Sequence, residues 1–150
     1  MSSIKSLIED AIKDPTLAST IDVDKLLEVH KENQGKTTTT IMKEIVDILG
    51  EHIVASEQVE LLSKKLLGYQ YIDQICDIRL GRFVRWIKRG SGGNLCRGGI
   101  VTSIQIEDSG VKLLCQNVKM GFSRLRWEDC VLFQQLSLEE QMIMKINESL

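Results

Sequence analysis

Apolar side chains recur every three or four residues through the first half of the chain, which is the spacing of amphipathic helices. The stripe at residues 3–14 predicts a first helix, and Pro15 ends it because the residue before a proline is disfavoured in the helical region. Three more helices are expected at 22–33, from within the threonine run 37–40 to Gly50, and at 56–67 with Ser56 as the N-cap. These four short helices favour an antiparallel bundle, followed at 69–76 by a short helix or a linker.

Beyond residue 77 the pattern changes, and β-branched and aromatic side chains alternate with polar ones, as they do in strands. Turn residues separate five such segments, at 78–89, 100–106, 111–117, 122–127 and 131–133. Ser137 and Glu140 then have the spacing of a capping box, which predicts a last helix at about 138–148.

The five predicted strands have the layout of a small barrel. Gly98 and Gly99 would allow sharp curvature at the start of the second strand, and residues 128–130 leave room for one tight helical turn. Over residues 78–134 this layout resembles the Src-homology-3-type (SH3-like) or Tudor-like barrel. The predicted fold class is α+β, with an N-terminal helical bundle at 1–75, a small five-stranded SH3-like antiparallel β-barrel at 76–135 and a C-terminal helix at 136–150.

The net charge of −2 hides an asymmetry between the two halves of the chain. Residues 1–75 carry 8 basic and 13 acidic side chains, whereas residues 76–130 carry 10 basic and 5 acidic ones. Because the basic segment is the predicted barrel, we expect a negatively charged partner to bind there.

Nine side chains of the predicted barrel form the candidate site for nucleic acid or for an acidic protein partner: Arg82, Arg85, Lys88, Arg89, Arg97, Lys119, Phe122, Arg124 and Arg126. In the fourth predicted strand, alternation places Phe122, Arg124 and Arg126 on one face. Ser123, Leu125 and Trp127 lie on the other face. Arginines on an exposed face can contact phosphates, and a phenylalanine beside them can stack on a base.

Other interpretations of the basic and aromatic residues are open. Charges on an edge strand also prevent aggregation, and the arginines can pair with the acidic helices of the same chain. A methyl-lysine cage needs three or four converging aromatic rings, for which Trp86, Phe122 and Trp127 are the candidates. Packing of these rings in the core would explain them equally well.

No catalytic, cofactor or metal motif emerges from the sequence, which predicts a protein that is not an enzyme and needs no cofactor. The run 35–37 lacks the first glycine of a phosphate-binding loop, because His30 occupies that position. The four cysteines are too widely spaced for the close pairs of a zinc site, so we expect free thiols at Cys76, Cys96, Cys115 and Cys130. No segment has the pattern of a signal peptide or a membrane span, so we expect a soluble cytoplasmic protein without membrane contact.

Four segments resemble small uncharacterised proteins of large DNA viruses, namely 80–87, 98–101, 113–115 and 133–137. The resemblance implies a viral protein, located in the host cytoplasm or in the virion. The leading functional hypothesis is a binding module whose basic barrel face contacts nucleic acid or an acidic protein. The alternative hypothesis is a structural or assembly protein, for example a virion component, whose charges serve contacts between subunits.

Overall fold

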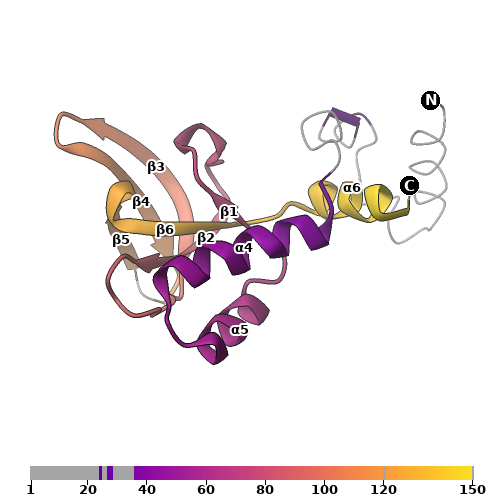
Figure 1. Cartoon of the computed structure of the whole chain (residues 1–150). Helices are drawn as coiled ribbons and strands as arrows, with labels where there is room; N and C mark the ends of the chain where they lie inside the picture. Colours follow the sequence, from indigo (N-terminus) through magenta and orange to yellow (C-terminus); the bar gives the residue numbers. More distant parts are fainter. Residues whose placement is uncertain (1–23, 25–26, 29–35, 120, 150) are drawn as a thin grey trace. The chain divides into compact units, whose positions relative to one another are not determined.

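Three helices and six strands make up the part of the chain that the computed structural model describes, which is residues 24, 27–28, 36–119 and 121–149 (Figure 1). The helix predicted at 3–14 lies outside these residues, as does most of the helix predicted at 22–33. The antiparallel bundle of four N-terminal helices therefore stays a prediction.

The chain divides into two compact units. One is Met42–Gln135, here called the sheet unit, and the other combines Met1–Ile41 with Leu136–Leu150. Three helices are described: α4 (Thr38–His52), α5 (Ser56–Lys65) and α6 (Leu138–Ser149). From Met42 onward α4 belongs to the sheet unit, together with all of α5.

The threonine run starts α4, as the sequence predicts. The Thr37 backbone N–H donates to Thr40 Oγ1 at 2.9 Å, and the Thr40 N–H donates back to Thr37 Oγ1 at 3.2 Å. These bonds satisfy two of the donors that a helix start leaves without partners. The predicted end at Gly50 is wrong, because α4 continues to His52 and Gly50 does not adopt the positive φ that ends many helices.

The start of α5 and the start of α6 differ in how well the sequence predicted them. Ser56 is the first helical residue of α5 rather than its N-cap, and the N-cap position is held by Ala55 without a side-chain hydrogen bond. At α6 the predicted capping box is confirmed. The Ser137 N–H donates to Glu140 Oε1 at 3.0 Å, and the Glu140 N–H donates to Ser137 Oγ at 3.1 Å.

The strands form one antiparallel sheet in the order β1-β6-β2-β3-β4-β5. Their bounds are β1 (Tyr69–Ile72), β2 (Phe83–Lys88), β3 (Gly99–Glu107), β4 (Gly110–Asn117), β5 (Gly121–Arg126) and β6 (Cys130–Gln135). Two single 3-10 turns accompany them, η1 (Ile75–Asp77) after β1 and η2 (Trp127–Asp129) between β5 and β6.

The prediction of five strands closed into a barrel is wrong in two respects. The segment predicted as a short helix or linker contains a sixth strand, β1, which pairs with β6. Among the described residues no ladder joins β1 to β5, so the sheet is open and these two strands are its edges. The first predicted strand also begins later than expected, because Gly81 has a φ of +84° and precedes the start of β2.

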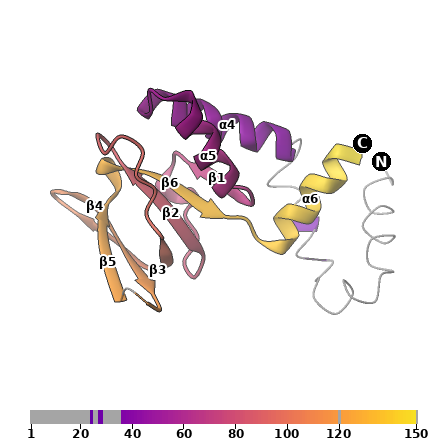
Figure 2. The ribbon, with the colours of Figure 1, turned by 90° about the horizontal axis from the view of Figure 1, so that it is seen from below.

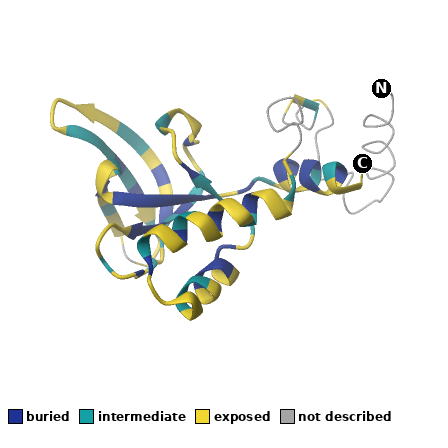
Figure 3. Cartoon of the chain, in the orientation of Figure 1, coloured by how far each residue is buried: buried dark blue, intermediate teal, exposed yellow. Residues whose placement is uncertain are grey.

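The two faces of the sheet are buried in different ways. One face carries the inner core, which includes Val84, Trp86, Val101, Leu113 and Leu132. On the other face α4 and α5 lie beside β1, β6 and β2, so that β6 is buried almost along its whole length (Figures 2 and 3). Neither α4 nor α5 covers that face of β4 and β5.

Gly98 and Gly99 serve close approach of the backbone rather than curvature alone. Gly98 has a φ of +93°, and a Cβ at this position would collide with the carbonyl oxygen of Val84. A Cβ at Gly99 would lie 2.9 Å from the carbonyl oxygen of Gln116. Both positions therefore need glycine, which lets the start of β3 fit between β2 and β4.

Candidate partner-binding face

The candidate site is the side of β3, β4 and β5 that neither α4 nor α5 covers, here called the outer face. Its side chains alternate with those of the inner core, and cross-strand pairing arranges them in rows. Phe122 stands opposite Gln116, which stands opposite Ile100. The next rows of β4 and β5 pair Leu114 with Arg124 and Lys112 with Arg126.

Phe122 and Arg124 are both exposed on the outer face. The Phe122 side chain is 65% exposed, although phenylalanine usually lies in a core. Arg124 is exposed and has no hydrogen bond or ion pair with any residue that the structure describes. Leu125, which lies between Arg124 and Arg126 in the chain, is only 6% exposed, and this confirms the predicted alternation of β5.

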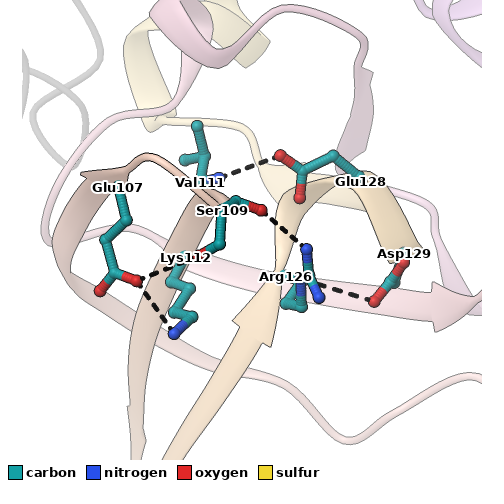
Figure 4. A network of polar contacts seen from close by, with 7 residues as sticks. All are labelled: Glu107, Ser109, Val111, Lys112, Arg126, Glu128 and Asp129. Carbon is teal, nitrogen blue, oxygen red and sulfur yellow. Dashed lines mark hydrogen bonds and ion pairs between the residues drawn. The ribbon is translucent and has the colours of Figure 1, made fainter.

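Arg126 lies on the same face, but other groups of the protein already hold it. Its Nη2 donates to the carbonyl oxygen of Ser109 at 2.8 Å, and its Nε lies 3.9 Å from a carboxylate oxygen of Asp129 (Figure 4). The neighbouring Lys112 forms an ion pair with Glu107 at 3.0 Å. The acids that hold these two cations belong to the sheet and to η2, and not to α4 or α5.

Glu128 completes this network from η2. Its Oε1 accepts the backbone N–H of Val111 at 2.9 Å, so it ties η2 to the start of β4 (Figure 4). Hydrogen bonds from the Val111 N–H and from its own backbone N–H lower the pKa of the Glu128 carboxyl below the usual value of 4.5. A Cβ at Gly110 would lie 2.6 Å from the same oxygen, so glycine leaves room for the carboxylate.

The remaining predicted cations do not converge on Phe122 and Arg124 as one patch. Arg85 is half-buried, and its Nε donates to the carbonyl oxygen of Cys96 at 3.0 Å. Arg89 directly follows β2, and its Nη1 lies 3.3 Å from Nε2 of His52. Lys88, the last residue of β2, is exposed. These three cations therefore lie in β2 or directly after it, in the part of the sheet beside α4 and α5.

Two cations lie nearer to Phe122. Arg97 and Lys119 are exposed, the first in the loop before β3 and the second in the turn between β4 and β5. Asn117 links the two segments, because its Nδ2 donates to the carbonyl oxygen of Gly98 at 2.8 Å. Arg82 is half-buried just before β2, beside β3, where its carbonyl oxygen accepts the Val101 N–H at 3.0 Å.

A methyl-lysine cage is wrong for this fold, because its three candidate aromatic rings do not meet. Trp86 belongs to the inner core and is 8% exposed, and Trp127 packs against the same core. Phe122 points from the opposite face of the sheet. The two tryptophans are therefore core residues, as the competing interpretation predicted.

The outer face also contains residues that the sequence analysis did not select. Leu114 and Gln116 belong to β4, between β3 and β5. Leu114 stands opposite Arg124, and Gln116 stands opposite Phe122. The alternation along β4 places them on one face, but only the strand register shows which residues of β5 they meet. No single-sequence signal supplies that register.

The cysteines are free thiols, as predicted. Cys115 and Cys130 are buried in the inner core, and burial raises the pKa of each to about 11. Within the described residues no group of three or more His, Cys, Asp or Glu side chains is arranged to hold a metal ion. No helix in the described part of the chain is long and apolar enough to cross a bilayer.

Comparison of the chain with protein-family models, with curated proteins and with solved structures gave no match. The chemistry of the outer face is therefore the basis on which a partner can be inferred.

Proposed function

We propose that the protein is a non-enzymatic binding module that holds an acidic protein partner on its outer face. The observation that carries this proposal is the pair Phe122 and Arg124, which stand two residues apart on one face of an edge strand. The aromatic ring offers apolar area, and the guanidinium has no partner among the described residues. A carboxylate beside an apolar side chain matches this pair in charge and in polarity.

The distribution of the cations favours an acidic protein segment over a nucleic-acid strand. A phosphate backbone needs a continuous track of cations, because each neutralised phosphate adds to the affinity. Arg126 is held by Ser109 and Asp129, and Arg85 by Cys96. Arg89 and Lys88 lie beyond the outer face, so Arg124 has few free cations near it.

Single-stranded nucleic acid is the second candidate partner. Phe122 beside Arg124 supports it, because one exposed ring can stack on a base while a neighbouring cation contacts a phosphate. Arg97 and Lys119 would extend the contact around the ring. We keep this candidate as an outcome of the experiment below.

A structural role in an assembly, such as that of a virion component, is the alternative proposal, and the charges would then serve contacts between copies. The viral resemblance of the second half of the chain supports it. The run of strands β2 to β5, followed by η2 and β6, also supports a distant relationship to the SH3-like layout. In that layout too the function would rest on binding rather than on chemistry.

A titration of the full chain tests the proposed function. The probes are a short glutamate-rich peptide, an oligothymidine DNA and an oligouridine RNA, each measured by fluorescence anisotropy at low and high salt. We expect the peptide to bind at low salt and Arg124→Gln to weaken it about fivefold, or about 1 kcal/mol for an exposed charge pair.

Lys43→Gln is the matched control, because it removes one exposed positive charge from α4 and leaves the outer face intact. We expect this variant to bind the peptide like the unmodified chain. Equal losses in the two variants, or no peptide binding at low salt, would contradict the proposal. Tighter binding of the oligonucleotides, with a steep salt dependence, would replace the acidic protein by nucleic acid as the partner.

A further inference from the structure

Strand β5 leaves one edge of its backbone without a strand partner. It is the last strand of the sheet and pairs only with β4 among the described residues. In an antiparallel ladder about half of the N–H and C=O groups of an edge strand point away from its neighbour. Figure 2 shows β5 at a border of the sheet, and no other described strand pairs with its free side.

The other edge is less suited to receive a partner. Strand β1 has four residues, whereas β5 has six. The side chains of Tyr69 and Tyr71 are half-buried, and Ile72 is buried. An added strand therefore finds a longer backbone and more exposed side chains at β5.

The side chains of β5 define what an added strand must carry. On the outer face its residues would stand directly opposite Phe122, Arg124 and Arg126, at the distance at which cross-strand pairs interact. On the inner face they would stand opposite Ser123, which is half-buried, and Leu125, which is buried. The matching strand alternates acidic residues on the outer face with β-branched apolar residues on the inner face.

Charge also decides against a second copy of the same strand. If β5 paired with β5 of a second copy, Arg124 and Arg126 of both copies would lie close together, because the strand has only six residues. Like charges in adjacent strands are destabilising. An acidic strand meets the same arginines with the opposite charge. The arginines thus block self-association and select the partner at the same edge.

We infer that the acidic partner binds as an extended segment added to the sheet next to β5, with a carboxylate opposite Arg124 and an apolar residue opposite Leu125. This inference rests on the proposed function and specifies its binding mode. Backbone hydrogen bonds to the open edge supply affinity, and the alternating side chains supply specificity.

Amide exchange of the full isotope-labelled chain, measured by NMR, tests the added strand directly. The probe is a short peptide of alternating glutamate and valine. We expect the outward-pointing amides of β5 to exchange about tenfold more slowly at saturation, because they become hydrogen-bonded. Amides of α5 serve as the internal control and should exchange at an unchanged rate.

Two further probes separate strand addition from simple charge attraction. The same peptide with every backbone amide N-methylated keeps its side chains but cannot donate to the edge, and we expect it to bind at least tenfold more weakly. Arg124→Gln should weaken the unmodified peptide and leave β5 protected in the complex that still forms at saturation.

The outcomes distinguish this inference from the proposed function. Peptide binding without protection of β5, or equal binding of the N-methylated peptide, overturns strand addition and leaves an acidic partner on the outer face. No peptide binding at low salt overturns both. Protection of β5 in the free chain that rises with concentration, with a dimer in light scattering, overturns the inference in favour of a second copy.

Discussion

Glu128 shows how one surface carboxylate holds separate parts of the sheet together. Glu128 lies in η2, just before β6, and its carboxylate accepts a hydrogen bond from the backbone N–H of Val111 at the start of β4. Its neighbours Arg126 and Asp129 connect the same turn to Ser109. The end of the outer face is thus fixed by contacts between residues that are far apart in the chain.

Removal of this carboxylate should have a pH-dependent effect. The hydrogen bond from Val111 keeps the folded-state pKa of Glu128 below its unfolded value, so the ionised form stabilises the fold above the unfolded pKa. This contribution is lost as the pH falls through the folded pKa. We expect the difference in urea midpoint between the unmodified chain and Glu128→Gln to be largest near neutral pH and to vanish in acid. A constant difference would contradict it, and Asp108→Asn in the nearby turn is the control.

The buried thiols should resist alkylation in the folded chain. Burial raises the pKa of Cys115 and of Cys130 to about 11, so the reactive thiolate is scarce at pH 8. Cys76 is exposed. In a mass-spectrometric time course with iodoacetamide, we expect Cys76 to react first and the two core thiols only after unfolding. Labelling of Cys115 or Cys130 at the rate of Cys76 would show that the inner core is open.

At the scale of elements, a glycine can be required by a positive φ or by a lack of space for a Cβ, and the sequence alone does not distinguish the two reasons. Gly110 is the first residue of β4 and has a φ of +130°, and Gly121 is the first residue of β5 and has a φ of +76°. Only Gly110 is also crowded, by the carboxylate of Glu128, whereas nothing lies within 4 Å of a Cβ at Gly121. The two positions therefore allow a crowded and an uncrowded glycine of positive φ to be compared.

Gly110→Ala should cost more stability than Gly121→Ala. Both alanines adopt an unfavourable φ, and the value of +130° at Gly110 lies further from the left-handed helical region than the value of +76° at Gly121. Only Gly110→Ala also displaces the Glu128 carboxylate. Loss of the hydrogen bond between Glu128 and Val111 adds to the difference in urea unfolding. The excess should shrink when both variants are made in a Glu128→Ala background, and the part that remains reflects the different φ of the two positions. An unchanged excess would mean that the collision with Glu128 does not contribute to it.

Local signals predicted the elements better than their assembly. The threonine run and the Ser137–Glu140 capping box marked helix starts, because side-chain caps depend on residues three apart in the chain. Strand β1 was missed, since four residues are too few to show a period. Its role becomes visible only in its pairing with β6, some sixty residues later in the sequence.

For the whole molecule, alternation predicted which face each residue of β5 takes, but not which cations are free. The basic residues that the sequence analysis selected lie on different parts of the sheet and do not form one patch. Arg126, Arg85 and Arg89 are each directed at groups of the same chain, and Arg124 is left facing solvent. Those contacts join segments that are separated in the chain, so no sequence pattern could separate the held cations from those that stay exposed.

The openness of the sheet is the second property that only the whole molecule shows. Five strands with short turns suggested closure, yet β1 joins at β6 and leaves β5 as an edge. That edge carries Phe122 and Arg124, so the feature that contradicts the barrel also creates the proposed binding site. The predicted preference for an acidic strand therefore rests on a single pairing, between Arg124 and an acid on the incoming strand.

A charge swap across that pairing is the most direct test. The unmodified chain and Arg124→Glu are each titrated with two peptides, one alternating glutamate with valine and one alternating lysine with valine. We predict that the unmodified chain prefers the glutamate peptide and that Arg124→Glu prefers the lysine peptide, with the ratio changing by about fivefold or more, or roughly 1 kcal/mol. If both proteins keep the same preference, residue 124 does not face the partner and the account is wrong.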